Sequence, residues 1–192
     1  MLEKYAYLFE EHTALIIVDM VNGFLTEGPL SSPRSAAVLP ACETLLRTAH
    51  AAGAPVLAFA DCHEPDCIEF QSFPPHCIRG TSESEIAPSL REIGGFAVIE
   101  KNSTNGAIHP AFQKWLDAHG SLTRIVVCGV CTDICVMQFC LTLKTLCNQN
   151  ERPLEVVLVR EAAATYDAPG HDGDASEEAA VQFMQQAGIR IV

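Results

Sequence analysis

The stretch GVCTDICV, residues 129–136, holds two cysteines four positions apart, and a third cysteine lies just before it. A cysteine attacks carbonyl carbon as its thiolate, which is favoured at the amino end of a helix, where free N–H groups and partial positive charge gather. Cys128 lies in an apolar run and Cys131 at the turn that follows, whereas Cys135 falls in the first turn of a predicted helix. Position alone leaves the choice of nucleophile between Cys131 and Cys135, with Cys135 favoured.

Cys128 and Cys131 also form a C-x-x-C spacing, which is typical of thioredoxin-like redox proteins. In those proteins the first cysteine is exposed at the start of a helix, whereas Cys128 is expected inside a strand. A thiol-redox protein, or a non-catalytic metal-binding protein, is therefore the weaker alternative to a hydrolase.

Two charged residues at the ends of other apolar runs could assist a thiol. Asp19 ends the run ALIIVD, and Lys101 ends the run FAVIEK. Attack of a thiol on a carbonyl requires a group that takes and returns a proton, and donors that hold the oxyanion. A carboxylate beside an ammonium could hold the proton, and the backbone amides of the cysteine turn could hold the oxyanion. Each charge alone would suit a salt bridge at a strand end, so their convergence with the cysteine turn is what favours catalysis.

The segment DCHEPDCIEFQSFPPH combines two imidazoles with two carboxylates. Asp61 and His63 lie two residues apart, so their side chains share a face of an extended segment. Glu69 and His76 follow in a proline-containing loop, and the set suits a divalent first-row ion such as zinc, iron or manganese. Two competing interpretations remain. The segment could be a polar surface loop, or Cys62, Cys67 and Cys77 could form a thiolate metal site, although their spacing lacks a C-x-x-C pair.

Six apolar runs alternate with segments of helical spacing, and these elements must position the reactive residues. The predicted strands are 14–19, 54–61, 96–101, 124–130, 154–160 and 189–192. The predicted helices are 36–53, 85–95, 109–120, 132–148 (with Thr132 as its N-cap) and 176–188. Nearly continuous apolar strands are typical of a parallel sheet covered on both faces. We therefore predict one α/β domain over residues 1–192, a three-layer α/β/α, Rossmann-like arrangement with a six-stranded, mainly parallel sheet.

In such a sheet, ligands bind outside the carboxyl ends of the strands. Asp19, Asp61 and Lys101 each end a predicted strand, and the cysteine turn follows another. Four separate stretches of the chain are therefore expected to converge on one crevice.

Length and charge narrow the classes of function. The 192 residues suffice for one domain with a sizeable core, and a net charge of −12 disfavours nucleic acid, since phosphate binding requires a basic face. No apolar run reaches the roughly 18 residues of a membrane span, and the first residues lack a signal-peptide core. We expect a cytoplasmic protein whose nine cysteines are mostly reduced thiols.

Five stretches of the chain resemble the isochorismatase-like cysteine hydrolase superfamily, and within it the nicotinamidases. The G-V-x-T-D-x-C-V block is the most specific of them, and FPPHCIRGT points to the nicotinamidase branch. The stretches follow the family's order along nearly the whole chain: ALIIVDMVNGF (14–24), DCHEPDCIEFQSFPPHCIRGT (61–81), VIEKNSTNGA (98–107), VVCGVCTDICV (126–136) and VREAAATYDAPGH (159–171).

The resemblance implies the isochorismatase-like hydrolase fold and a role for several residues. Asp19 takes the position of the catalytic base, Lys101 that of the lysine of the triad, and Cys135 that of the nucleophile. A cis peptide bond is implied between Val130 and Cys131, where it would direct the amides of Cys131 and Cys135 towards one oxyanion. The implied metal ligands are Asp61, His63, Glu69 and His76, and the implied substrate-pocket aromatic residue is Phe24.

The activity implied by the resemblance is hydrolysis of nicotinamide to nicotinate and ammonia through a thioester, a reaction of pyridine nucleotide salvage and NAD metabolism. The implied metal is Zn²⁺, with Fe²⁺ and Mn²⁺ as alternatives, and the implied assembly is a homo-dimer or homo-tetramer. NSTNGA (102–107) lacks an aromatic residue that many nicotinamidases have. The alternative is therefore another amidase of the superfamily, acting on a carbamoyl, ureido or maleamate-type substrate. Tyr166 and His171 match a motif near the rim of the crevice and are interpreted as structural or interface residues.

Overall fold

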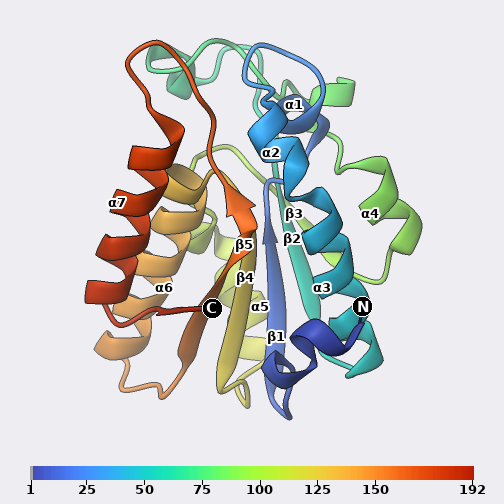
Figure 1. Cartoon of the computed structure of the whole chain (residues 1–192), viewed down its shortest axis with the longest axis vertical. Helices are drawn as coiled ribbons and strands as arrows, with labels where there is room; N and C mark the ends of the chain where they lie inside the picture. The colour runs from blue at the N-terminus through green and yellow to red at the C-terminus, as the bar shows by residue number, and fades with distance from the viewer. Residues whose placement is uncertain (1) are drawn as a thin grey trace.

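A parallel sheet of six strands lies between two layers of helices in the computed structural model, which describes residues 2–192 (Figure 1). The strands lie in the order β3-β2-β1-β4-β5-β6, and each pairs in parallel with its neighbours. This order is that of a Rossmann sheet. The predicted α/β architecture is thus confirmed, and the sheet is parallel throughout. The strands are β1 (Thr13–Val18), β2 (Val56–Asp61), β3 (Ala97–Lys101), β4 (Arg124–Val130), β5 (Glu155–Ala164) and β6 (Arg190–Ile191).

The apolar run of β1 is continuous because both faces of this central strand are covered. Leu15 and Ile17 pack into the core on one side of the sheet, whereas Ala14, Ile16 and Val18 pack into the core on the other side. Successive side chains of a strand point to opposite faces, so a strand buried on both faces loses the polar alternation of a half-exposed one.

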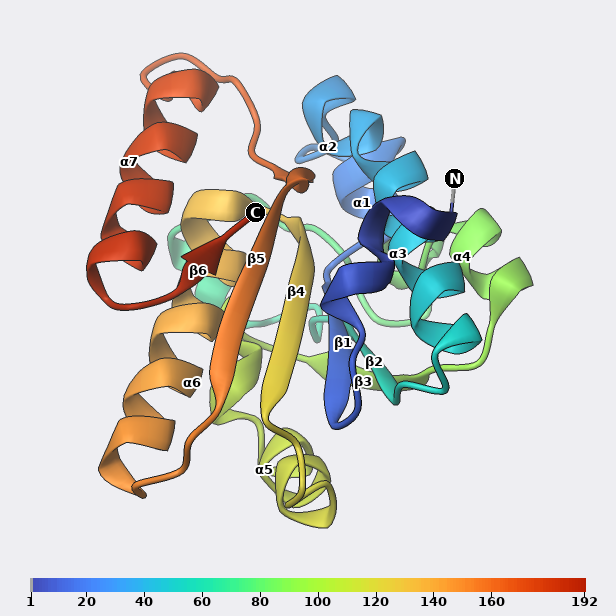
Figure 2. The ribbon, with the colours of Figure 1, turned by 60° about the horizontal axis from the view of Figure 1, so that its bottom comes forward.

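The two helical layers lie on opposite faces of the sheet (Figure 2). The first layer contains η1 (Leu2–Leu8), α1 (Asn22–Leu25), α2 (Pro33–Ala37), α3 (Leu39–Ala51) and α4 (Pro88–Ile93). The second contains α5 (Pro110–Ala118), α6 (Met137–Gln149) and α7 (Gly173–Gln186). The remaining turns are η2 (Ile68–Gln71), η3 (Ser82–Ser84), η4 (Gly106–Ile108) and the π-helical turn η5 (Thr132–Val136).

The helix predicted over 36–53 begins later, as α3, and the shorter α2 precedes it. Pro40 lies in the first turn of α3, where its missing N–H costs no helical hydrogen bond, and Pro33 begins α2 in the same way. Within residues 2–192, no helix combines the length and apolar character needed to cross a membrane. All nine cysteines are free thiols in this structure, and all are buried.

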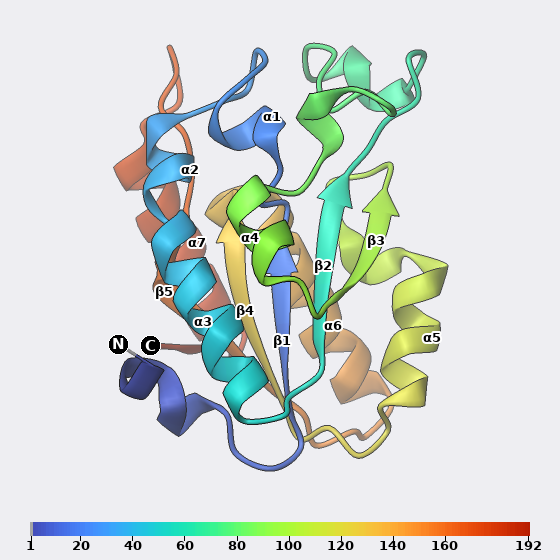
Figure 3. The same cartoon turned by 90° about the vertical axis from the view of Figure 1, so that its right-hand side faces the viewer.

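The strand order changes direction between β1 and β4. The loops at the carboxyl ends of the strands carry the predicted site residues (Figure 3). Gly129 of β4 has φ +119°, and a Cβ atom there would lie 2.0 Å from the carbonyl oxygen of Val18. Only glycine lets the two strands approach so closely at this point. The close approach brings the end of β4 beside Asp19, the first residue after β1.

Candidate active site

Three of the predicted site residues meet at the carboxyl edge of the sheet. Asp19 follows β1 with φ +51°, Lys101 ends β3, and Cys135 lies in η5 after β4. The Nζ atom of Lys101 lies 2.8 Å from Oδ2 of Asp19 and 3.9 Å from Sγ of Cys135. Asp19 and Lys101 are almost completely buried, and Cys135 is only 6% exposed. The structure therefore brings a thiol, a carboxylate and an ammonium together from three distant parts of the chain.

Burial controls the protonation of this group. It raises the pKa of Asp19 to about 6, although Lys101 acts to lower it. It also raises the pKa of the Cys135 thiol well above its usual value, again against the effect of Lys101. Burial acts to lower the pKa of Lys101, but Asp19 and Cys135 raise that pKa well above normal. The resting site thus holds a protonated thiol, a carboxylate and an ammonium.

This result corrects the expectation that the helix start lowers the pKa of Cys135. Desolvation disfavours the thiolate, and in this buried site it outweighs the local positive charge. The thiol must therefore give its proton to a neighbour as it reacts, and Asp19 is the adjacent carboxylate.

The turn that carries Cys135 is wider than an α-helical turn. The backbone N–H groups of Ile134 and Val136 both donate to the carbonyl oxygen of Cys131, each at 3.1 Å. Cys131 is the N-cap of this turn, whereas Thr132, which had been predicted to be the N-cap, is already inside it. The peptide bond between Val130 and Cys131 is cis. Cys128 is fully buried within β4 and Cys131 is buried as well, so neither offers the exposed thiol that a redox pair requires.

The four residues predicted as metal ligands form one cluster. Asp61, His63, Glu69 and His76 each offer a ligand atom, and these atoms lie within 4.8 Å of one another. The Oδ2 atom of Asp61 lies 2.9 Å from Nε2 of His63 and 3.0 Å from Nε2 of His76. The Oε1 atom of Glu69 lies 3.7 Å from Nε2 of His63.

Hydrogen bonds on the outer side of the imidazoles show that this cluster fits a cation. The Nδ1 atom of His76 lies 2.8 Å from the carbonyl oxygen of Pro74, and that of His63 lies 2.9 Å from Oδ1 of Asn102. Both oxygens are acceptors, so each Nδ1 carries the proton and each Nε2 turns a lone pair towards Asp61 unless a second proton is bound. A divalent cation would take the place of a second proton on each Nε2, and the outer hydrogen bonds are typical of metal-binding histidines.

The competing thiolate site does not form in the part of the chain that the structure describes. The four-residue cluster contains no cysteine. Cys67 contacts the cluster from outside, with Sγ 3.4 Å from Nδ1 of His63. The cluster is therefore a site with nitrogen and oxygen donors rather than a thiolate site, and such donors suit zinc, iron or manganese.

Asp61 joins the cluster to the residues around Cys135. Its Oδ1 atom accepts a hydrogen bond from Nζ of Lys101 at 2.7 Å, while Oδ2 faces the two imidazoles. Burial acts to raise the pKa of Asp61, but Lys101 and His63 hold that pKa well below its usual range. Sequence reasoning missed this contact, because the pairing of β2 with β3 cannot be deduced from the two runs alone.

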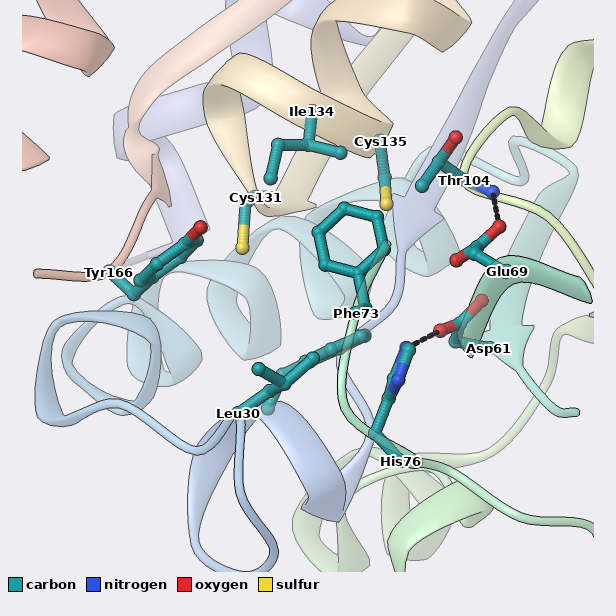
Figure 4. A pocket seen from close by; sticks show the side chains of 11 residues that line it. Leu30, Asp61, Glu69, Phe73, His76, Thr104, Cys131, Ile134, Cys135 and Tyr166 are labelled. Atoms are coloured by element: carbon teal, nitrogen blue, oxygen red, sulfur yellow. Dashed lines mark hydrogen bonds and ion pairs between the residues drawn. The ribbon is translucent and has the colours of Figure 1, made fainter. Parts of the chain in front are cut away.

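A cavity of about 410 Å³, including its open mouth, lies between Cys135 and the cluster (Figure 4). Because this volume includes the open mouth, the enclosed space beside the thiol is smaller. Phe24 lines this cavity, with its ring centroid 5.7 Å from that of His76. Sequence reasoning missed the apolar walls Leu30, Phe73 and Ile134, and it placed Tyr166, which also lines the cavity, only near the rim of the crevice. The pocket suits a small flat molecule with one polar group beside the thiol.

The chain is similar to known proteins along most of its length. The protein-family model described as the isochorismatase domain matches residues 13–191. Nicotinamidase 1 of Arabidopsis thaliana is 35% identical over 180 residues, covering 84% of this chain and 73% of the relative. Streptothricin hydrolase of Streptomyces noursei is 31% identical over 156 residues, covering 81% of this chain and 51% of the relative. The crystal structure of a pyrazinamidase of Pyrococcus horikoshii in complex with zinc has a TM-score of 0.78 and 28% identity, covering 94% of this chain and 98% of that chain.

Proposed function

The chain belongs to the isochorismatase family, and from this premise we propose that it is a cysteine amidohydrolase that converts nicotinamide to nicotinate and ammonia. Its similarity to Nicotinamidase 1 of Arabidopsis thaliana supports this substrate. The pocket also supports this substrate, because apolar and aromatic side chains line it beside the Cys135 thiol, as a flat aromatic amide requires.

One observation carries the proposal. Lys101 lies within 3.9 Å of Cys135 and 2.8 Å of Asp19, all three are buried, and Cys135 also lines the pocket. Nucleophilic catalysis by a thiol requires an adjacent proton acceptor and a dry site. A strand-end salt bridge explains the contact of Lys101 with Asp19, but it does not explain a thiol beside them that faces the pocket.

In the proposed reaction, the Cys135 thiol gives its proton to Asp19 as the sulfur attacks the carboxamide carbon. The ammonium of Lys101 stabilises the charges on both neighbours, and the backbone amides of Cys131 and Cys135 hold the oxyanion. Asp19 then returns the proton to the leaving nitrogen, the C–N bond breaks, and ammonia departs. Water hydrolyses the thioester to nicotinate, and the thiol is restored.

We further propose that Asp61, His63, Glu69 and His76 hold a divalent ion, with Zn²⁺ as the first choice and Fe²⁺ or Mn²⁺ as alternatives. The pyrazinamidase of Pyrococcus horikoshii was solved in complex with zinc, which supports this choice. When bound, the ion would supply a Lewis acid that anchors the ring nitrogen of the substrate. The Phe24 and Phe73 rings line the same cavity and would contact the substrate ring.

An ammonia-release assay over a panel of amides tests the proposal. The panel contains nicotinamide, pyrazinamide, maleamate, a carbamoyl compound and a ureido compound, each measured with and without a chelator. We expect nicotinamide and pyrazinamide to be hydrolysed fastest and the chelator to slow both. Hydrolysis confined to the maleamate, carbamoyl or ureido compounds would replace the proposed substrate with that of a related amidase.

The resemblance to the family also leads us to propose a cytoplasmic homo-dimer or homo-tetramer. Light scattering of the purified chain measures the assembly directly. A monomeric mass at the concentration used for the activity assay would contradict it.

A further inference from the structure

The loop that follows β5 forms one end of the pocket, and the proposed reaction gives it no role. Tyr166 of this loop is half-buried and lines the cavity. Figure 4 shows its ring beside the Cys131 side chain, at the end of the pocket opposite Asp61 and Glu69. The Cys135 side chain lies between these two ends. Tyr166 therefore bounds the space on the far side of the thiol from the metal cluster.

A tight turn folds the loop back onto Tyr166. Ala168 and His171 exchange backbone hydrogen bonds of 3.0 Å and 2.9 Å, and Gly170 has φ +84°. Proline followed by glycine with positive φ is the signature of a type II turn. The turn lays the imidazole of His171 flat on the phenol of Tyr166, with ring centroids 4.2 Å apart and an interplanar angle of 13°.

His171 in turn is bound to the segment that carries Cys135. Its Nε2 atom lies 2.7 Å from Oδ2 of Asp133, two residues before the nucleophile, and its Nδ1 atom lies 2.9 Å from the carbonyl oxygen of Tyr166. A carbonyl and a carboxylate both accept hydrogen bonds, so both ring nitrogens of His171 carry protons. Burial acts to lower the pKa of His171, but Asp133 raises it above the usual value, which agrees with an imidazolium.

The other end of the loop is also fixed. Arg34 donates from Nε to the carbonyl oxygen of Thr165 at 3.1 Å and from Nη2 to Asp174 at 2.6 Å. The backbone N–H of Gly173 donates to Asp167 at 2.8 Å. Tyr166 thus lies in a loop that is tied to α2, to α7 and to the cysteine turn, and its ring forms a rigid wall.

We propose that Tyr166, held in place by the Asp133–His171 pair, restricts the enzyme to amides with a small leaving group, ammonia rather than a substituted amine. Tyr166 is the specificity-determining residue and His171 is a positioning residue. The inference rests on the proposed function. With the substrate ring anchored at the metal cluster and its carbonyl at Cys135, a substituent on the amide nitrogen extends away from the ring, towards the end of the pocket that Tyr166 closes.

The test is the ratio of kcat/KM for N-methylnicotinamide, methylated on the amide nitrogen, to kcat/KM for nicotinamide. Loss of the wall in Tyr166→Ala, or of its support in His171→Gln, should raise this ratio about tenfold or more, because a pocket discriminates against one extra methyl group by a factor of this order. Tyr166→Phe keeps the ring and is the matched control, with the ratio of the wild type. A purely structural role would lower both activities together and leave the ratio unchanged, which would overturn the proposal.

A second measurement is independent of the hydrolytic activity. Alkylation of Cys135 by iodoacetamide and by the bulkier N-benzyl iodoacetamide, read by peptide mass spectrometry, gives a ratio of rates for each variant. Tyr166→Ala and His171→Gln should favour the bulkier reagent about tenfold relative to the wild type, and Tyr166→Phe should not. If the wild type fails to hydrolyse nicotinamide but the alkylation ratios shift, the proposed function is wrong and the wall stands. If the ratios stay constant in folded variants, the wall is wrong.

Discussion

The ammonium of Lys101 binds the carboxylate of Asp61 at 2.7 Å, and it binds the carboxylate of Asp19 at 2.8 Å. One buried cation therefore connects the proposed proton acceptor to a proposed metal ligand. Asp61 and Lys101 are paired residues on the adjacent strands β2 and β3, so the contact is built into the register of the sheet. The two halves of the site should consequently respond together to changes at Asp61.

The substitution Asp61→Asn should affect both halves of the site at once. It removes one of the two negative charges that hold Lys101, and it replaces a charged oxygen of the metal cluster with a neutral amide. We expect weaker metal binding and a loss of kcat/KM of about 10³-fold or more that saturating Zn²⁺ does not restore. His76→Gln is the control, since His76 contacts Oδ2 of Asp61, whereas Lys101 contacts Oδ1. Excess metal should partly restore the kcat/KM of this variant. Full rescue of Asp61→Asn by metal would show that the contact with Lys101 is unimportant.

The two pocket cysteines should differ sharply on substitution. Cys135→Ala removes the proposed nucleophile and should lower kcat by about 10³-fold or more. Cys131→Ala removes a thiol whose pKa burial raises to about 12, and it leaves the backbone amide in place. We expect this variant to keep most of the activity. Steady-state ammonia release and the melting temperature of both variants make the comparison, and equal losses in the two would contradict the assignment.

The acid limb of the pH profile should report Asp19. The carboxylate form accepts the thiol proton, and burial raises the pKa of Asp19 to about 6. As pH falls through that value Asp19 becomes protonated, so log kcat/KM should be flat above it and should drop about tenfold per pH unit below it. The profile of kcat/KM for nicotinamide between about pH 4.5 and about pH 8, a range that brackets that pKa, provides the check. An acid limb near the pKa of an unperturbed aspartate, about 4, would count against this environment.

The close approach of β4 to β1 predicts a strong effect of a small substitution. A Cβ atom at Gly129 would meet the carbonyl oxygen of Val18 at 2.0 Å, and φ there is +119°. We expect Gly129→Ala to lower the free energy of unfolding by about 2 kcal/mol or more, through both overlap and backbone strain.

Gly53→Ala is the matched control for this prediction. Its φ of +68° carries the backbone penalty, but no atom lies within 4 Å of the added Cβ. Gly53→Ala should lower the free energy of unfolding by only about 1 kcal/mol. Urea denaturation of both variants measures the two losses. Equal losses for the two would show that the contact with Val18 adds nothing.

The sequence predicts the positions of the strands well because each central strand is apolar on both faces. ALIIVD and RIVVCGV both correspond to strands within one residue at each end. The meeting of Asp19, Lys101 and Cys135 follows from the rule that parallel strands present their carboxyl ends at one edge. The contact between Asp61 and Lys101 could not be predicted in this way, because strand order and register depend on packing between distant parts of the chain.

The walls of the pocket and the protonation of the thiol were also beyond prediction from the sequence. Tyr166 faces the cavity only because a proline–glycine turn returns His171 to Asp133, and that partner is 38 residues away along the chain. The pKa of Cys135 depends on the depth of its burial, which no local pattern reveals. The sequence indicates that Cys135 lies at a helix start, which favours the thiolate. The fold buries Cys135, and the resulting desolvation raises its pKa by more than the helix start lowers it.

The most direct test of the central claim is to trap the acyl group during turnover of nicotinamide. Hydroxylamine is added to the metal-loaded enzyme with nicotinamide, and in a parallel sample the reaction is quenched in acid and the cysteine peptides are mapped by mass spectrometry. The account predicts that nicotinoyl hydroxamate forms at the expense of nicotinate, that the quenched enzyme carries the nicotinoyl group on Cys135, and that Cys135→Ala yields neither product. Formation of nicotinate without hydroxamate or acylated Cys135, or an acyl group on another residue, would contradict it.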